Sequence, residues 1–450
     1  MRKNGAVPAD SLTARLSTHQ SLLLGSLLFG LFFGAGNLIF PISMGLTAGS
    51  SVLPATLGFL VAAVGLPILG VVASALAGTV SLHELASRVA PWFGVLFTCA
   101  LYLTIGPFFA IPRTATVSYE MAFGGTLSDG AGRWALAGFT AVFIAVALAA
   151  AIRPGKLLDY VGKWLTPVFL VLLGLLLVVA RLGSGSAAPA AQGPYATHAL
   201  SQGVLDGYNT MDALASLAFA IVVIEAVRRL GVTQPRRIAI EVGRAGVLAA
   251  VAMCVIYAAL AILGSRSTHV VARDANGAVA LSRVASESFG GIGHLLAALI
   301  MGVACLKTCI GLLTACAEMF RTMFPGSLSQ RGWATVFAVV SFAVANVGLD
   351  TIIKAAVPVL VLLYPLAIGI IGLGLLDPWV RHRPWAYRLT MLGAGVVSLL
   401  FLLATQAGVP AGVASAASAA GGVLPGFELG FGWILPALIG LVAGMALPRR

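Results

Sequence analysis

Long apolar runs, separated by short polar segments, follow one another along most of the chain. Runs of about 18 or more mostly apolar residues are long enough to cross a bilayer as a helix. They are continuous rather than alternating, and a helix satisfies its own backbone hydrogen bonds, so the pattern predicts helices and not a barrel. We predict twelve spans, near residues 20–45, 52–78, 92–117, 134–152, 160–182, 208–230, 240–263, 290–319, 332–347, 351–375, 387–407 and 429–447.

The composition agrees with a membrane protein. Of the 450 residues, 59% are hydrophobic and only 9% are charged, which excludes a water-soluble globular protein. The net charge is +12, but the basic residues lie mainly in the short segments between apolar runs. Such a distribution indicates membrane topology rather than a nucleic-acid footprint.

The positions of Lys and Arg predict the orientation of the spans. If the amino terminus is cytoplasmic, 19 basic residues lie inside and 7 outside, which with Lys307 in the eighth run accounts for all 27. An excess of basic residues marks cytoplasmic loops. We therefore expect both termini to be cytoplasmic, and the split favours twelve spans over eleven. Residues 1–19 are predicted to be a retained cytoplasmic tail, because no cleavage site follows a short apolar core.

The segments outside the spans carry no recognisable function. The longest, 183–203 and 265–288, are small and polar, and neither is large enough to fold alone. The five cysteines lie in apolar runs, and the HELASR string at 83–88 lacks the second histidine of a zinc site, so we predict no metal site. A channel filter and a cluster of catalytic side chains are not visible either. Function is expected within the helix bundle.

The first span contains the unusual stretch GLFFGAGNLIFP, residues 30–41. Gly30 and Gly34 form a GxxxG pattern, which is common where two membrane helices pack closely. The alternative is that GAGN, residues 34–37, interrupts the helix, because two glycines lower helix propensity by about 2 kcal/mol relative to alanine. A break exposes carbonyl and N–H groups that transporters use to hold a cation and a carboxylate.

Five further motifs follow this one in order: GFLVAAVGLPILGVVA, GPFFAIPRTATVSYE, PGKLLDYVGKWLTP, GYNTMDALASLAFAIV and LTACAEMF. Together the six motifs resemble the bacterial branched-chain amino acid:cation symporter family, the LIV-II carriers, within the amino acid-polyamine-organocation superfamily. The likeness extends from about residue 20 to residue 375. On this resemblance we favour the broken helix over the packing motif.

The resemblance implies an all-α polytopic fold like that of the leucine transporter. In that fold two five-helix repeats of inverted topology bind the substrate where spans 1 and 6 are broken. Here the repeats would be residues 20–182 and 208–375, joined by an extracytoplasmic linker at 183–207 and followed by helices 11 and 12 in 376–450.

The resemblance also implies a function. The family members are secondary active symporters that import leucine, isoleucine and valine with Na⁺ or H⁺ across the bacterial inner membrane. We expect no enzyme activity and no cofactor other than the co-transported ion. The expected partners are these substrates and the lipid bilayer, without nucleic acid or an obligate protein partner. The nearest alternative is a carrier of another neutral amino acid, and a channel or membrane enzyme is more distant.

The substrate-binding residues implied by the resemblance are Gly34, Ala35, Gly36, Asn37, Ser216 and Phe219. Ala35 and Gly36 would offer backbone N–H groups to the substrate carboxylate, and Asn37 would bridge the half-helices or ligate a cation. The sixth span is expected to break within residues 213–220, where small side chains dominate. Ordinary helix packing is the alternative role of Ser216 and Phe219.

The implied cation-coupling residues are Gly30, Phe33, Ala304, Lys307 and Thr308. Backbone carbonyls and the Thr308 hydroxyl would be the ligands, whereas Lys307 stands where sodium-coupled relatives have a hydroxyl. Its ammonium could occupy the cation position, which would favour proton coupling or a permanently filled site. Alternatively, Lys307 faces a wet cavity and pairs with a carboxylate, for which Glu225 is the candidate.

Three other polar residues are given structural roles. We expect Asp212 to cap a helix or anchor a loop, because it begins the sixth span. Arg113 is expected to anchor the outer end of the third span. Glu318 is expected to pair with Arg321, its i+3 neighbour.

Overall fold

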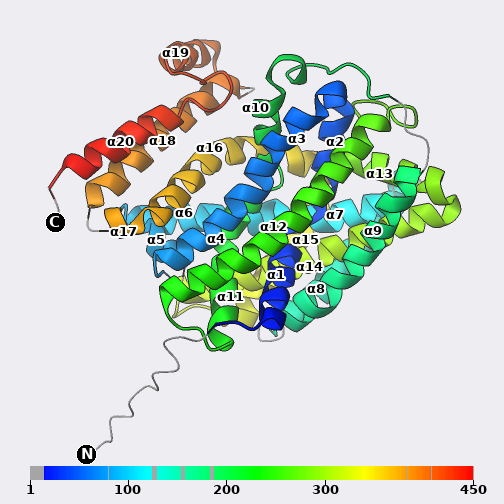
Figure 1. Cartoon of the computed structure of the whole chain (residues 1–450), viewed down its shortest axis with the longest axis horizontal. Helices are drawn as coiled ribbons and strands as arrows, with labels where there is room; N and C mark the ends of the chain where they lie inside the picture. The colour runs from blue at the N-terminus through cyan, green and yellow to red at the C-terminus, as the bar shows by residue number, and fades with distance from the viewer. Residues whose placement is uncertain are drawn as a thin grey trace, which may run out of the picture.

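The computed structural model describes residues 15–79, 81–123, 129–153, 158–182, 187–381, 383–406 and 408–448, so residues 1–14 of the predicted tail lie outside it. These residues form helices and no strands, as predicted (Figure 1). The first-half helices are α1 (Thr18–Phe32), α2 (Ala35–Ala48), η2 (Gly49–Ser51), α3 (Val52–Leu60), η3 (Val61–Gly65), α4 (Leu66–Leu76), α5 (Leu82–Ala86), α6 (Pro91–Leu103), η4 (Thr104–Phe108), α7 (Ala110–Phe123), α8 (Asp129–Ala151), η6 (Leu158–Leu165) and α9 (Thr166–Leu182).

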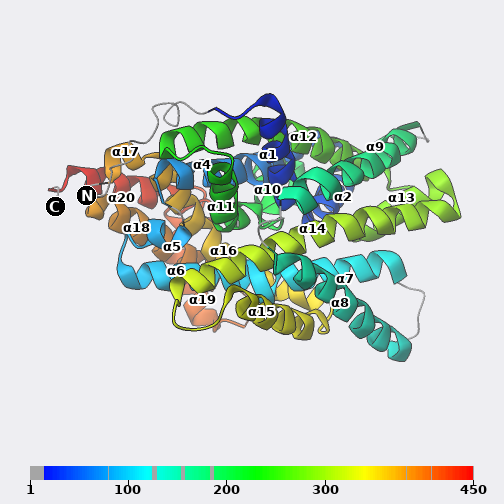
Figure 2. The same ribbon diagram turned by 90° about the horizontal axis from the view of Figure 1, so that it is seen from below.

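The described residues of the second half form helices joined by turns and loops. Its helices are α10 (Tyr195–Tyr208), α11 (Asp212–Arg229), α12 (Pro235–Arg266), α13 (Gly277–Phe289), α14 (Gly291–Met323), α15 (Gln330–Ala345), α16 (Leu349–Leu375), α17 (Asp377–Val380), α18 (Pro384–Thr405), α19 (Ala411–Gly422) and α20 (Ile434–Ala446). Helices α18, α19 and α20 lie at one edge of the molecule in both ribbon views (Figures 1 and 2).

Each of the twelve predicted ranges contains a helix or a broken helix. By length and hydropathy, 8 helical segments of the described chain could cross a membrane, or up to 9 if the bent pair α10 and α11 is one span. Helices α1, α15 and α20 fall short at 15, 16 and 13 residues. The chain is therefore a polytopic membrane protein, and the count of twelve stays a prediction, as do the boundaries of the two repeats.

The first span is broken between α1 and α2. Phe33 and Gly34 are extended, with φ/ψ of −77°/91° and −114°/−159°. The predicted interruption of this helix by the glycine-containing motif is confirmed, and its position is the start of GAGN. The third span is also interrupted, at Gly106, which has non-helical φ/ψ of −88°/−116° ahead of Pro107.

The sixth span breaks earlier than predicted. Helices α10 and α11 are bent by 43° at Asn209–Met211, and Met211 has a left-handed φ of 64°. The prediction of a break within 213–220 is wrong, because those residues are continuous helix in α11. Alanine is the best helix former, so small side chains alone do not break a helix. The segment 183–207, predicted as a linker between the repeats, contains most of α10; its role as a linker stays a prediction.

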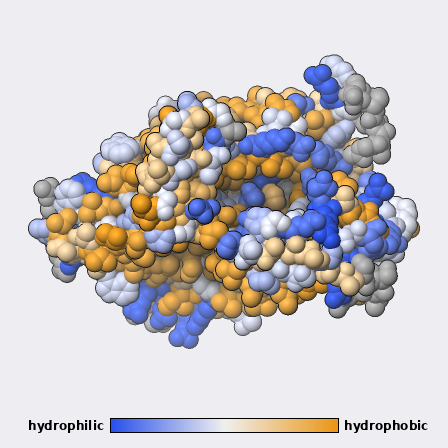
Figure 3. Space-filling model, turned by 90° about the horizontal axis from the view of Figure 1, so that it is seen from above, coloured by the Kyte–Doolittle hydropathy of each residue, from blue (hydrophilic) through white to orange (hydrophobic). Residues whose placement is uncertain are grey.

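Burial separates an inner set of helices from an outer set. In the apolar window of α14, 56% of the residues are buried inside the protein, against 28% for α8 and for α18. Large apolar side chains such as Trp134 and Val171 are exposed on the outer helices, and apolar residues cover much of the surface in Figure 3. In lipid such exposure costs nothing, so these faces fit a bilayer. The inner helices α1, α2, α7, α11 and α14 position the site.

Candidate substrate and cation site

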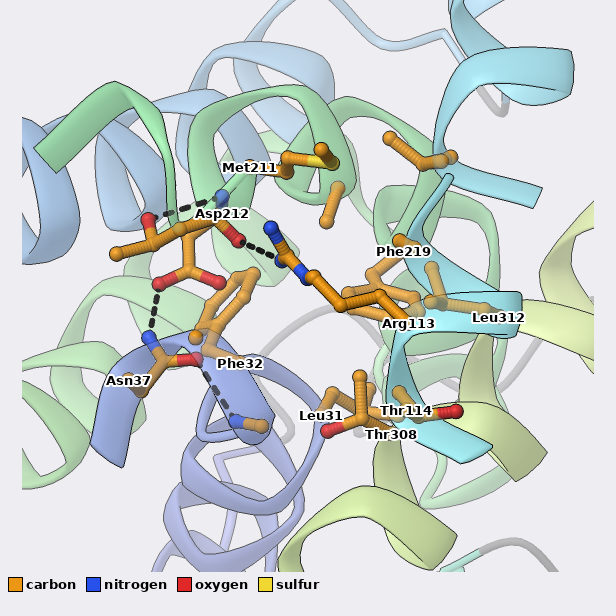
Figure 4. Close-up of a pocket in the computed structure, with 16 residues that line it drawn as sticks. Leu31, Phe32, Asn37, Arg113, Thr114, Met211, Asp212, Phe219, Thr308 and Leu312 are labelled. Atoms are coloured by element: carbon orange, nitrogen blue, oxygen red, sulfur yellow. Dashed lines mark hydrogen bonds between the residues drawn. The ribbon is translucent and has the colours of Figure 1, made fainter. Parts of the chain in front are cut away.

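A small cavity lies where the breaks of the first and sixth spans face α7 and α14 (Figure 4). Its lining residues are Leu31, Phe32, Gly34, Gly36, Asn37, Ile105, Ala110, Arg113, Thr114, Thr210, Met211, Asp212, Ala215, Phe219, Thr308 and Leu312. Its free volume is about 20 Å³, which is room for about one water molecule. The cavity must therefore widen before it can hold an amino acid.

Asn37 ties the two breaks together. Its Oδ1 accepts a hydrogen bond from the Gly34 N–H at 2.8 Å, across the interruption of the first span. Its Nδ2 donates to the carboxylate of Asp212 at the start of α11 and to the Tyr257 hydroxyl of α12. In a continuous helix the Gly34 N–H would instead donate to the Gly30 carbonyl. The side chain of Asn37 thus replaces a backbone partner and joins the first span to the sixth.

The N-terminus of α2 forms one wall of the cavity. The N–H groups in the first turn of a helix have no intrahelical acceptor and carry partial positive charge. Ala35 and Gly36 stand at this position, as the first two residues of α2. A Cβ added at Gly36 would lie 3.2 Å from Nη2 of Arg113 and 2.9 Å from Cε2 of Phe40. A side chain at this position would have to displace the ends of Phe40 and Arg113.

The sixth span contributes a different set of residues from the one predicted. Phe219 lines the cavity, and its ring lies 5.9 Å from that of Phe32. Ser216 does not line it, because its hydroxyl donates to the Ala213 carbonyl at 2.7 Å and packs against Gly70 of α4. The prediction for Ser216 is therefore corrected. Its packing alternative is the one observed.

Asp212 occupies a place that the sequence interpretation missed. It lines the cavity, and its carboxylate accepts the hydrogen bond from Asn37. Helix capping is not its role, although the bond to Asn37 does anchor the start of α11. The neighbouring Thr210 lines the same wall, and its hydroxyl accepts from the Asp212 N–H at 3.3 Å.

Arg113 lies at the cavity and not at the outer end of the third span. Its side chain runs from α7 toward the break of the sixth span (Figure 4). Nη1 donates to the Asn209 carbonyl at 2.9 Å, and Nη2 donates to the Thr210 carbonyl at 3.3 Å. The guanidinium also lies 5.5 Å from the ring centroid of Phe40. A charge within an apolar run is a functional candidate by default, and this signal was present in the sequence.

Lys307 is buried beside the first break but does not line the cavity. Its Nζ lies 4.2 Å from the ring centroid of Phe169, 4.9 Å from that of Phe29 and 5.4 Å from that of Phe33. We call these three rings the aromatic cage. Within the part of the chain that the structure describes, Nζ has no hydrogen-bond or ion-pair partner.

The candidate partner of Lys307 is excluded. Glu225 is half exposed and pairs with Arg229 at 3.0 Å on the outer surface of α11. The prediction of a Lys307–Glu225 pair is therefore wrong, and the cage of rings replaces the wet, carboxylate-lined surroundings considered above. The predicted pair of Glu318 and Arg321 is confirmed at 2.5 Å.

The other cation-coupling candidates lie around the first break. Thr308 lines the cavity, and its hydroxyl has no hydrogen-bond partner among the described residues. A Cβ added at Gly34 would lie 2.8 Å from that hydroxyl. Gly30 packs tightly against Val161 and Thr166, and Ala304 is buried one helical turn before Thr308. Their role as cation ligands stays a prediction.

Comparison with known proteins identifies the family. The family model described as "Branched-chain amino acid transport protein" matches residues 17–450. The chain belongs to this family. A relative from Lactobacillus delbrueckii subsp. lactis, named branched-chain amino acid permease BrnQ, is 43% identical over 430 residues, which cover 94% of this chain and 96% of the relative. The Bacillus subtilis permease BrnQ is 39% identical, over 97% of this chain and 98% of the relative.

Solved structures of transporters have the same fold. A variant of the Eremococcus coleocola manganese transporter superposes with a TM-score of 0.62 at 14% identity, covering 96% of this chain and 97% of the other. MhsT in complex with L-phenylalanine superposes with a TM-score of 0.51 at 18% identity, covering 95% and 97%. The chain is thus a multi-pass membrane transporter of the family, with a leucine-transporter-like fold, and not an enzyme.

Proposed function

We propose that the chain is a secondary active symporter that imports leucine, isoleucine and valine with protons or sodium ions across the bacterial inner membrane. The observation that carries the proposal is the broken first span, whose glycines and Asn37 form one wall of the central cavity. Broken helices present N–H groups to a carboxylate and carbonyl groups to a cation. The names of the relatives, branched-chain amino acid permeases, support the same substrate class.

The lining of the cavity suits an aliphatic side chain. Apolar groups come from Leu31, Ile105 and Leu312, and Phe32 and Phe219 add two rings. Removing one methylene from a ligand in such a pocket costs only about 1–3 kcal/mol. We therefore expect leucine, isoleucine and valine to compete with one another over a narrow range of affinities, and smaller neutral amino acids such as alanine to compete weakly.

The aromatic cage around Lys307 favours protons as the coupling ion. A sodium ion held by the Phe33 carbonyl and Thr308 would lie close to the Lys307 ammonium. Two unit charges about 5 Å apart repel by about 3 kcal/mol at an effective dielectric constant of about 20. A proton on the amine would replace the metal ion at this place.

Uptake by purified protein in proteoliposomes tests the proposal. Labelled leucine is offered under an imposed proton gradient alone, a sodium gradient alone, and neither, with isoleucine, valine and alanine as competitors. We expect accumulation under the proton gradient and competition by isoleucine and valine. Accumulation of another neutral amino acid instead of leucine would select the alternative carrier. Passive, gradient-independent flux would contradict symport.

A further inference from the structure

Arg113 places a positive charge on the wall of the cavity. Among the described residues that line the cavity, Arg113 is the cation and Asp212 is the acid. The Arg113 side chain is only 7% exposed, and no ion pair to it is formed within the described chain. The Asp212 carboxylate carries the opposite charge in the same cavity, but it accepts a hydrogen bond from Asn37 and forms no ion pair with the guanidinium. A buried charge marks a functional group inside a membrane, and a bound anion would give this guanidinium a directly hydrogen-bonded partner.

The guanidinium also lies beside a second group of anion-binding donors. The first turn of α2, whose N–H groups have no intrahelical acceptor, lines the same cavity through Gly36 and Asn37, and Gly36 brings this backbone next to Nη2 of Arg113. In addition, the Nε of Arg113 is buried and has no hydrogen-bond partner in the described part of the chain. A planar guanidinium with a spare donor matches the two oxygens of a carboxylate.

The present acceptors of Arg113 fit a different ligand group. The carbonyls of Asn209 and Thr210 lie at the carboxyl end of α10, where the helix dipole attracts cations. A primary ammonium could donate to these oxygens as the guanidinium does now. The two charged ends of an amino acid therefore match the donors and the acceptors that Arg113 now brings together.

We propose that Arg113 binds the carboxylate of the substrate. On binding, the guanidinium turns from the Asn209 and Thr210 carbonyls to the carboxylate, next to the N-terminus of α2. The two carbonyls then accept hydrogen bonds from the substrate ammonium, with the Asp212 carboxylate close by. This movement also widens a cavity that now has room for about one water molecule. The inference rests on the proposed function, because it assumes a zwitterionic substrate.

Selectivity between leucine and leucinamide tests the proposal. Leucinamide keeps the ammonium and the side chain but lacks the carboxylate. Dissociation constants of both labelled ligands are measured by equilibrium dialysis with purified wild type and Arg113→Gln. We expect the dissociation constant of leucine to rise about 100-fold in the variant and that of leucinamide to change by about threefold or less. The ratio of the leucinamide constant to the leucine constant should therefore fall at least about tenfold.

If Arg113 only supports the structure of the sixth-span break, its replacement should weaken the binding of both ligands equally. An unchanged ratio would therefore overturn the proposal. Arg113→Lys is measured in parallel, since it keeps the charge, and there we expect a smaller fall in the ratio; if Arg113→Gln does not fold, this variant decides. Arg133→Gln, at an exposed position on α8, is the matched control and should leave both constants unchanged. If wild type binds another neutral amino acid and not leucine, the proposed function fails, but the same ratio measured with that amino acid and its amide still tests Arg113.

Discussion

Arg113 and Lys307 are two buried cations in one helix bundle, and their surroundings differ in kind. The Arg113 guanidinium faces the cavity and donates to backbone carbonyls at the sixth-span break. The Lys307 ammonium faces the aromatic cage beside the first break and has no hydrogen bond within the described chain. The first is placed to exchange its acceptors for a ligand, whereas the second is enclosed by aromatic rings next to a broken helix.

The energetics of the two sites point the same way. Desolvating an ammonium costs several kcal/mol, and each favourable ring contact returns about 0.5–2 kcal/mol. The cage therefore offsets part of the cost at Lys307, whereas Arg113 is compensated by hydrogen bonds to carbonyls. We expect Arg113 to govern substrate recognition and Lys307 to govern coupling.

Replacing Gly36 should have the largest effect, because a side chain there would block the part of the cavity next to Arg113. The side chain of Gly36→Val would collide with Phe40 and with the guanidinium of Arg113. We expect leucine uptake to fall about 100-fold or more, corresponding to about 3 kcal/mol. Proteoliposome uptake measures it. Gly138→Val is the control, since a Cβ there meets nothing within 4 Å; equal activity of both variants would contradict the broken-helix site.

Replacing Lys307 separates coupling from binding. Lys307→Met fills the cage with an apolar side chain of similar size, so the fold should be retained or stabilised. We expect gradient-driven accumulation of leucine to fall about tenfold or more, while leucine–leucine exchange continues. Counterflow and accumulation assays measure the two activities. Lys163→Met, at an exposed lysine, should change neither, and loss of exchange in Lys307→Met would place Lys307 in the substrate site instead.

A hydroxyl at position 307 tests whether Lys307 determines the coupling ion. If the ammonium takes the place of a sodium ion, Lys307→Thr should make leucine uptake depend on external sodium. The measurement is uptake as a function of sodium concentration at fixed pH. The same ion dependence in the variant and the wild type would argue against this role.

Removing the Asn37 side chain should have an intermediate effect. Asn37→Ala deletes the hydrogen bonds to Gly34, Asp212 and Tyr257 and leaves buried groups unpaired. Each such loss costs about 1–3 kcal/mol, so we expect leucine affinity to fall about tenfold and the melting temperature to drop. Thermal unfolding and equilibrium dialysis provide the readouts. Asn346→Ala, which removes an exposed hydrogen bond at the end of α15, should leave leucine affinity unchanged.

The smallest effect is expected at Ser216. Its hydroxyl bonds within α11 and does not face the cavity. Ser216→Ala should therefore change the KM for leucine by less than about twofold, within the usual range for a substitution away from a site. A change in KM of tenfold or more would contradict this prediction and indicate that Ser216 does contact the substrate.

Strong local patterns made the fold and the first break predictable. Two glycines beside Asn37 lower helix propensity at one point, and long apolar runs define spans without any knowledge of their neighbours. The break of the sixth span depends on a left-handed Met211, which no residue preference signals. Asn209, Thr210 and Asp212 compete with the helix through their side chains, and this weaker signal was available.

The errors at Ser216 and Glu225 have another cause. Both residues lie on α11. Their surroundings depend on the rotation of this helix about its axis, and packing against distant parts of the chain determines that rotation. Ser216 is turned toward Gly70 of α4, and Glu225 meets Arg229 at the surface of the same helix. A functional role of Arg113 could have been predicted from its apolar sequence surroundings. Its hydrogen-bond acceptors could not, because they belong to a different span.

A structure of the protein with bound L-leucine tests the central claim most directly. The account predicts leucine in the cavity between the two breaks, with its carboxylate at Gly36 and Arg113, its ammonium at the Asn209 and Thr210 carbonyls, and its side chain against Phe219. Leucine bound elsewhere, or with its carboxylate directed to Lys307 while Arg113 keeps its present hydrogen bonds, would contradict it.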